Sequence, residues 1–263
     1  QEICKALNIS GPFNLQLLAK ENRIKVIECN LRASRSFPFA SKVTNVNFAK
    51  LATQALLNEA PTDKRYQTVD LDYVAVKAAQ FSFSRLKGAD PRLGVEMSST
   101  GEVACFGESA EEALLCSLQS VGVRLPKKNI LATVGSLEDK VDLLPAFETL
   151  HAMDFVLYAT ERTHAFLESR GIPSILLHKL SEPRSPNIRE YLEEKRIDLI
   201  INIPKHYGGK EMTDGYHMRR LATDRGISLI TNVQLAKRIV EAMSAHKIEE
   251  IDVKAWSHFV STS

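Results

Sequence analysis

The sequence has few cysteines and no paired ones. They stand far apart, with no C-x-x-C motif and no histidine at metal-ligand spacing, so neither a disulfide framework nor a zinc site is expected. We predict reduced, mostly buried thiols. The four are Cys4, Cys29, Cys105 and Cys116. The glycine-rich signatures of a dinucleotide site and of a P-loop are also missing, so neither kind of nucleotide site is predicted.

Long apolar runs and a dominant charge are absent as well. No run approaches the ~18 residues of a membrane span, and the N-terminus lacks the charged and apolar regions of a signal peptide, so a cytosolic location is expected. Thirty-four Lys and Arg face 32 Asp and Glu, which leaves a formal charge of +2. That balance argues against nucleic acid or a membrane surface as a partner, and any anion site must be local.

The composition that remains is that of a globular protein of about two domains. Hydrophobic residues make up 44% and charged residues 25% of the 263 positions, which excludes a disordered or fibrous chain. The first residue is Gln1, and the opening residues resemble the tail of a helix that runs into a strand. We therefore expect the chain to be cut from a longer one.

The first half predicts a hairpin followed by mixed structure. Two β-rich runs, 13–20 and 24–29, flank a turn at Glu21-Asn22-Arg23. Asn47 is expected to cap a helix, and Ser109 with Glu112 forms the S-x-x-E pattern of a capping box.

From Leu125 onward, short apolar strands alternate with amphipathic helices, so we place a domain boundary between residues 125 and 126. Strands are predicted at 130–134, 155–160, 174–177, 197–203 and 227–231. Helices are predicted near 138–152, 163–170, 187–195, 214–224 and 233–244. The strands are continuously apolar, which is typical of a parallel sheet covered on both faces. The fold class expected for 126–263 is a doubly wound α/β domain.

Three oxygen-bearing side chains gather on one face of the predicted hairpin. Glu28 and Asn30 project to the same side of the second strand, and Gln16 lies opposite Glu28 if the turn is centred on Asn22. Such side chains suit Mg²⁺, which also keeps waters and substrate phosphate oxygens as ligands. From these residues alone, a plain solvent-facing sheet surface remains the alternative.

Two arginines, Arg32 and Arg35, follow the hairpin closely. Guanidinium groups bind phosphate oxygens well, so this pair is a candidate to hold a phosphate that the metal bridges.

In the second half, polar residues stand at the carboxyl ends of the predicted strands, where open parallel sheets bind ligands. Thr160 and Thr163 lead into a helix whose first N–H groups suit a phosphate, and Lys140 and Lys179, placed in neighbouring loops, are candidates for the countercharge. The alternatives are that Thr163 is an ordinary N-cap and that the two lysines belong to a solvated face. We expect neither Thr163 nor Lys179 to lie in the core.

The stretch GPFNLQLLAKENRIKVIECNLRASRSFPFASK (11–42) resembles the end of the second ATP-grasp unit of the carbamoyl-phosphate synthetase large chain, and 81–109 resembles the same family. The resemblance implies a partial ATP-grasp (α+β) piece over residues 1–125. It implies that Gln16, Glu28 and Asn30 are ligands of Mg²⁺ or Mn²⁺ at the ATP phosphates. It also implies that Arg32 and Arg35 are catalytic residues that contact the transferred phosphate or the carbamate.

Residues 130–243 resemble the methylglyoxal-synthase-like regulatory domain of the same family. The resemblance implies an effector site in which Thr160 and Thr163 bind a phosphate, with Lys140, Lys179 and Asn202 beside it. Members that bind UMP and IMP have lysine at the position of Lys179, whereas animal members have tryptophan. UMP, UTP or IMP is therefore the implied effector, rather than N-acetylglutamate.

The function implied is that of an ATP-dependent ligase of pyrimidine or arginine biosynthesis, carbamoyl-phosphate synthase. The implied partners are the remainder of the large chain, a glutaminase subunit or domain, the nucleotide effector and a second copy of the C-terminal domain. Because the adenine-binding part of the ATP-grasp unit is missing, this chain alone is expected to be inactive. Ala78 stands where ornithine-activated members have glutamate, so activation by ornithine is not expected.

Two other hypotheses remain open. One is a free-standing effector-binding module without catalysis, against which the Gln1 start argues. The other is methylglyoxal synthase, whose aspartate-bearing glycine-rich loop is not recognisable at 205–212.

Overall fold

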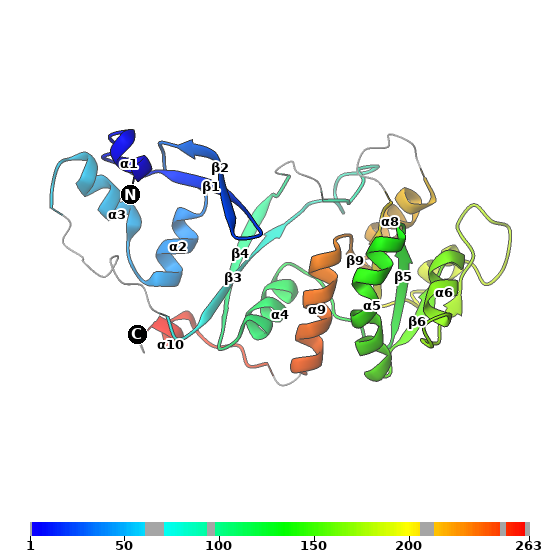
Figure 1. Cartoon of the computed structure of the whole chain (residues 1–263). Coiled ribbons are helices and arrows are strands. Elements are labelled where there is room, and N and C mark those ends of the chain that lie inside the picture. The colour runs from blue at the N-terminus through cyan, green and yellow to red at the C-terminus, as the bar shows by residue number, and fades with distance from the viewer. Residues whose placement is uncertain (1, 61–70, 94–97, 206–212, 248–250, 261–263) are drawn as a thin grey trace. The chain divides into compact units, whose positions relative to one another are not determined.

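The computed structural model describes residues 2–60, 71–93, 98–205, 213–247 and 251–260 (Figure 1). The chain divides into two compact units. Unit 1 comprises Gln1–Tyr73 with Lys254–Ser263, and unit 2 comprises Val74–Val253. None of the helices in the described ranges has the length and hydropathy needed to cross a bilayer. The four cysteines are free and only partly buried, so the prediction of mostly buried thiols is wrong.

Unit 1 is built on a hairpin and short helices. Its elements are α1 (Glu2–Ala6), β1 (Asn14–Lys20), β2 (Arg23–Asn30), α2 (Phe37–Thr44), α3 (Phe48–Leu56) and α10 (Trp256–Val260). Strands β1 and β2 pair antiparallel, which confirms the predicted hairpin. Asn47 caps α3 as predicted, since its side chain accepts a hydrogen bond from the Lys50 N–H at 2.9 Å. The indole of Trp256 donates to the Lys42 carbonyl at 3.0 Å and thereby ties α10 to α2.

The core of unit 1 is small. Among its described residues, the buried hydrophobic side chains are Val46, Tyr73 and Phe259. The rings of Tyr73 and Phe259 contact each other at a centroid distance of 5.7 Å. Both strands of the hairpin, in contrast, expose large apolar side chains to solvent. They are Leu17, Leu18, Ile24, Val26 and Ile27, each more than half exposed. Exposed apolar side chains gathered on one element are typical of a surface that takes part in an interaction.

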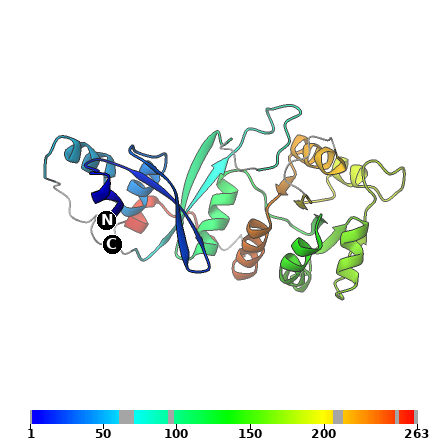
Figure 2. The same ribbon diagram turned by 45° about the horizontal axis from the view of Figure 1, so that its top comes forward.

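Unit 2 begins with a second hairpin, β3 (Val74–Gln80) and β4 (Gly101–Gly107), which α4 (Ala110–Ser120) covers. Figures 1 and 2 both show α4 alongside these strands. Ser109 caps α4 as predicted and accepts from the Glu112 N–H at 3.1 Å. The carboxylate of Glu112, however, accepts from the Glu108 N–H at 2.7 Å, one residue before the position that a capping box requires.

The rest of unit 2 is a five-stranded parallel sheet in the order β7-β6-β5-β8-β9. Its strands are β5 (Asn129–Val134), β6 (Val156–Ala159), β7 (Ile175–Leu176), β8 (Leu199–Ile203) and β9 (Ser228–Ile230). Its helices are α5 (Leu137–Ala152), α6 (Glu161–Glu168), α7 (Ile188–Glu193), α8 (Asp214–Arg225) and α9 (Val233–Ala245). Each lies at the predicted place in the sequence, which confirms the predicted alternation.

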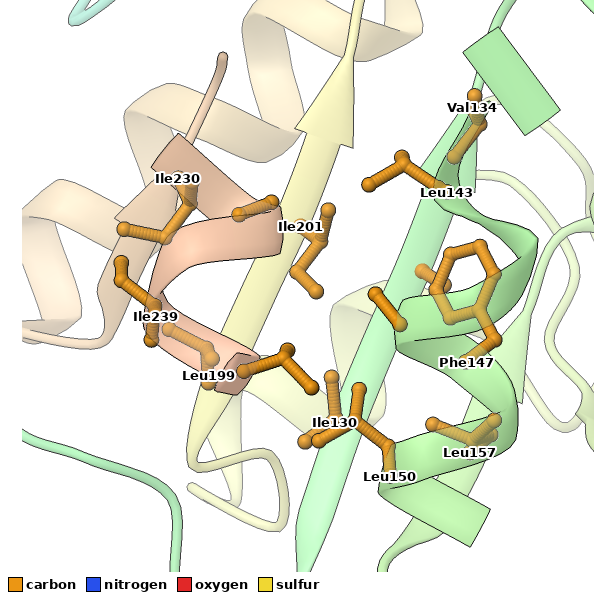
Figure 3. Close-up of a cluster of buried hydrophobic side chains, with 14 of the residues drawn as sticks. Ile130, Val134, Leu143, Phe147, Leu150, Leu157, Leu199, Ile201, Ile230 and Ile239 are labelled. Carbon is orange, nitrogen blue, oxygen red and sulfur yellow. The ribbon is translucent and has the colours of Figure 1, made fainter. Parts of the chain in front are cut away.

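Helices cover both faces of this sheet. Successive residues of each strand point to opposite sides, so neighbours on one strand pack against different helices. On β5, Ile130 and Ala132 belong to one buried cluster, shared with α5 and α9, whereas Leu131 belongs to another, shared with α7 and α8. Figure 3 shows Phe147 and Leu150 of α5 packed over the first of these faces. The doubly wound fold is confirmed. Unit 2 also contains β3, β4 and α4, so the boundary predicted at 125/126 falls inside it.

Candidate functional site

The hairpin of unit 1 brings three predicted ligands together. Gln16 on β1 is the register partner of Glu28 on β2, as predicted. Asn30 lies two residues beyond Glu28, and its Nδ2 donates to the Glu28 Oε1 at 2.8 Å. Glu28 and Gln16 are exposed and Asn30 is partly buried, so their oxygen atoms are open to a ligand.

The chemistry of this set fits a hard divalent cation. One carboxylate and two amide oxygens are the donors that Mg²⁺ prefers, with waters or phosphate oxygens completing its six ligands. Among the described residues no group of three His, Cys, Asp or Glu side chains is placed to hold a metal, and the hairpin set has one such side chain, Glu28, beside its two amides.

The two arginines lie directly after the hairpin. Arg32 and Arg35 are both exposed in the turn between β2 and α2, and the Arg32 Nη1 donates to the neighbouring Ala33 carbonyl at 3.3 Å. They therefore follow Glu28 and Asn30 closely in the sequence. Their predicted catalytic role stays a prediction.

At the carboxyl edge of the unit 2 sheet, the two threonines differ in their surroundings. Thr160 is the N-cap of α6, and its hydroxyl makes no capping hydrogen bond. Thr163 lies inside the first turn and is only 1% exposed. Its Oγ1 accepts from the Val134 N–H at 3.1 Å and lies 3.4 Å from the Val134 carbonyl oxygen. The expectation that Thr163 lies outside the core is wrong, and so is the alternative that makes it the N-cap.

Lys140 reaches the same turn from the neighbouring element. It belongs to the first part of α5 rather than to a loop, and it is buried at 6% exposure. Its Nζ donates to the Arg162 carbonyl at 3.0 Å, which places the ammonium at the N-terminal turn of α6, between the two threonines in sequence. Burial lowers the pKa of Lys140, and the positive charge of Arg162 adds to the effect. The structure thus places Lys140 against the turn of α6 that contains Thr160 and Thr163.

Lys179 is exposed in the turn that follows β7. Its carbonyl accepts from the Asn187 Nδ2 at 2.7 Å, which fixes the backbone of the turn. A cavity of about 350 Å³ opens beside it, with Arg184, Asn187 and Arg189 in its lining. No contact joins the side chain of Lys179 to Lys140 or to the threonines among the described residues, so its part in one site is a prediction.

Asn202 lies near the end of β8, beside β5. It is 5% exposed, its Nδ2 donates to Thr133 Oγ1 at 2.7 Å, and its Oδ1 accepts from Arg219 Nη1 at 2.8 Å. Arg219 in turn forms a two-point ion pair with Asp90. Sequence reasoning missed Thr133, Arg219 and Asp90. The one pattern in the sequence that pointed to these contacts is the pair of adjacent arginines, Arg219 and Arg220, in a helix with an apolar side.

The segments that follow β5 and β8 approach each other closely at this edge of the sheet. A Cβ on Gly135 would lie 2.5 Å from the Lys205 backbone nitrogen, so only glycine fits between the ends of β5 and β8. Residues 206–212, where the glycine-rich loop of a methylglyoxal synthase was sought, lie outside the described residues.

Two family models match separate parts of the chain. The carbamoyl-phosphate synthase L chain, ATP binding domain, matches residues 1–60, which contain the hairpin, and the MGS-like domain matches residues 142–231 of unit 2. Multifunctional protein URA2 of Saccharomyces cerevisiae is 48% identical over 252 residues, which is 92% of this chain and 11% of that protein. The chain belongs to the carbamoyl-phosphate synthase large-chain family.

Other members of the family align over nearly all of the chain. Multifunctional protein pyr1-3 of Dictyostelium discoideum is 44% identical over 96% of this chain and 12% of its own length. Carbamoyl-phosphate synthase [ammonia], mitochondrial, of Homo sapiens is 42% identical over 98% of this chain and 18% of its own length. The chain thus spans less than a fifth of these relatives. Similarity to them runs through both units, which the hypothesis of a free-standing effector module does not explain.

Proposed function

We propose that this chain acts as part of a carbamoyl-phosphate synthase, an ATP-dependent ligase, and that unit 1 contributes metal and phosphate ligands for the phosphorylation of carbamate. The observation that carries the proposal is the Gln16, Glu28 and Asn30 group, three hard donors on adjacent strand ends within the segment that matches an ATP-binding domain. Phosphoryl transfer needs such positioned charges rather than a covalent intermediate.

The residues have distinct parts in this proposal. Gln16, Glu28 and Asn30 hold Mg²⁺ or Mn²⁺, and the metal, when bound, offsets the negative charge of the ATP phosphates. Arg32 and Arg35 follow the hairpin in the sequence and are exposed. Their guanidinium groups orient the transferred phosphate or the carbamate through two-point hydrogen bonds. This chain supplies positive charge and ligand oxygens, and the adenine pocket comes from elsewhere.

Unit 2 is proposed to bind a nucleotide effector at the carboxyl edge of its sheet. The ammonium of Lys140 reaches the N-terminal turn of α6, whose N-cap is Thr160, and the first N–H groups and the dipole of that helix favour a phosphate. Thr163 holds that turn against the end of β5 through Val134. Lys179, in the turn after β7, and Asn202, near the end of β8, are proposed to complete the site. UMP, UTP or IMP supplies the phosphate.

The exposed apolar side chains of the first hairpin support a further partner, the remainder of the large chain. An isolated two-stranded hairpin is marginally stable, so a covering domain is required to hold its ligands in place. We therefore propose that catalysis needs that remainder and a glutaminase subunit or domain, and that the 263-residue chain alone is inactive. Self-association through unit 2 and a cytosolic location belong to the same proposal.

The proposal is tested in the complete synthetase that contains this chain, with the two phosphorylation steps measured separately. Glu28→Gln removes the one carboxylate of the ligand set while keeping its shape. It should slow carbamoyl phosphate-dependent ATP synthesis, the reverse of carbamate phosphorylation, by about 10²-fold or more. Bicarbonate-dependent ATPase should stay near its wild-type rate. Glu59→Gln, an exposed glutamate elsewhere in unit 1, is the matched control. Equal loss of both partial reactions would mean that Glu28 is structural.

A further inference from the structure

Arg219 on α8 binds in two directions at once. Its side chain is 4% exposed, and its Nε and Nη2 donate to the two carboxylate oxygens of Asp90 at 2.7 and 2.6 Å. Its remaining Nη1 donates to Asn202 Oδ1 at 2.8 Å. Arg219 therefore joins the end of β8 to residues 82–90, a segment that precedes the parallel sheet in the chain and is not part of it.

The link continues across the sheet edge. The Asn202 amide is oriented by a second hydrogen bond, from its Nδ2 to Thr133 Oγ1 at 2.7 Å. Thr133 precedes Val134, whose N–H is held by Thr163 in the first turn of α6. Hydrogen bonds, with one step along the backbone of β5 from Thr133 to Val134, thus connect the proposed phosphate site to Asp90 through side chains that are nearly all buried.

Arg220, the next residue, holds the same segment in another way. Its Nη1 donates to the carbonyls of Phe83, Leu86 and Ala89 at 3.0 to 3.1 Å, and its Nε and Nη2 donate to Asp224. None of these partners belongs to the sheet. Arg220 therefore anchors the segment regardless of what happens at the strand ends, whereas the contacts of Arg219 depend on Asn202.

We propose that Arg219 is a positioning residue that couples occupancy of the effector crevice to the 82–90 segment. The proposal rests on the effector site proposed above. A phosphate at the strand end attracts the guanidinium of Arg219. The phosphate then competes with the carboxylate of Asp90 for the fixed number of N–H donors of that guanidinium. Because the guanidinium of Arg219 is planar and rigid, its rotation toward the ligand weakens both of its hydrogen bonds to Asp90 together. Effector binding then loosens the segment, while Arg220 keeps it attached.

Hydrogen exchange of the 263-residue chain, with and without UMP, tests the coupling. The amides of Leu86 and Ala89, which are bonded within the segment, should exchange about fivefold faster or more when UMP is bound. Asp90→Asn keeps the shape of the acceptor and removes its charge. It should tighten UMP binding about fivefold or more, because Asp90 no longer competes for Arg219 and coupling between two sites is reciprocal, and it should abolish the UMP-dependent change in exchange. Arg238→Gln, which breaks an exposed pair with Glu241 on α9, is the control and should change neither.

A ligand-free arm separates this inference from the effector proposal. Asn202→Ala removes one partner of Arg219 and Asp90→Asn weakens the other by removing its charge, so both should speed exchange in 82–90. The double variant should exchange no faster than the more affected single one, because both act through the same guanidinium. If none of UMP, UTP and IMP binds, the proposed effector site is wrong, and this ligand-free arm still tests whether Arg219 links Asn202 to Asp90. Additive effects, or an Asp90→Asn chain that keeps its full response to UMP, would overturn the coupling.

Kinetics of the complete synthetase distinguish a coupling role of Arg219 from a merely structural one. Asp90→Asn and Arg219→Lys, the second of which keeps the charge and loses the fork, should retain kcat without effector. We expect UMP to shift the KM for ATP of the wild-type synthetase, and both variants should lose that shift. A shift in KM of wild-type size in both variants would contradict the proposal.

Discussion

Gln16 faces Glu28 across the first hairpin because Ile27 bulges out of the second strand. The turn is a two-residue one at Glu21 and Asn22, so regular pairing from Lys20 and Arg23 outward would place Gln16 opposite Ile27. The register instead shifts between Gln16 and Leu17, and Glu28 becomes the partner. β-Bulges re-aim side chains beside functional sites, and this one brings an amide and a carboxylate together.

The turn of this hairpin carries strain that a substitution should relieve. Glu21 and Asn22 have φ angles of 49° and 61°, and a left-handed backbone disfavours glutamate far more than asparagine. Glu21→Asn should stabilise the hairpin by about 0.5–1 kcal/mol. Slower hydrogen exchange of the amides that join β1 and β2 is the measurement. Glu21→Ala keeps the penalty, so equal protection in the two variants would contradict the explanation.

The two threonines of α6 should separate stability from binding. Thr163→Val leaves the buried Val134 N–H without its partner and should lower the free energy of unfolding by about 1–3 kcal/mol. Thr160→Val removes a hydroxyl that makes no capping bond, so it should change stability by less than about 0.5 kcal/mol. It should weaken UMP binding about tenfold or more, since a charge-assisted contact is lost.

Urea unfolding and calorimetric titration of the same two variants provide the comparison. If Thr160→Val destabilises the chain as much as Thr163→Val and leaves the affinity unchanged, then Thr160 supports the fold and does not contact a ligand.

The lowered pKa of Lys140 predicts a pH dependence of stability. Its ammonium has a lower pKa in the folded chain than in the unfolded one, so the unfolded state binds more protons between those two values. Stability should therefore rise with pH through that window, up to about pH 10.4. Lys140→Met should lose this rise. A wild-type profile that is parallel to that of the variant would contradict the assignment.

The same group predicts proton uptake on binding. A phosphate beside Lys140 raises its pKa, so UMP binding should take up protons at alkaline pH, where the phosphate itself is already fully ionised. Calorimetry in buffers of different ionisation enthalpy measures this uptake, and Lys140→Met should abolish it. Uptake of equal size in the variant would assign it to another residue.

The sequence was sufficient for the sheet and for the ligand face of the hairpin. Continuous apolar runs between amphipathic segments predict a covered parallel sheet because burial on both faces leaves no polar position. The pairing of Gln16 with Glu28 was also predicted, although from a turn centred on Asn22. The bulge at Ile27 offsets the shorter turn, and no local pattern signals it.

The surroundings of single side chains at the sheet edge were beyond sequence reasoning. The sequence predicts Thr163 to be a phosphate ligand or an N-cap outside the core, because nothing in it shows that the Val134 N–H needs a partner. The ion pair of Asp90 with Arg219 spans 129 positions of sequence. Such long-range contacts depend on how α8 packs, so charge and spacing along the chain carry no record of them.

The central claim, that unit 2 binds a phosphorylated nucleotide at the carboxyl edge of its sheet, is tested most directly by calorimetric titration of the 263-residue chain. UMP, UTP, IMP and N-acetylglutamate are the ligands to compare, with Lys179→Trp as the variant. We predict saturable binding of at least one nucleotide, weakened about tenfold or more by Lys179→Trp, and no binding of N-acetylglutamate. Binding of N-acetylglutamate alone, or of no phosphorylated ligand, would contradict the account.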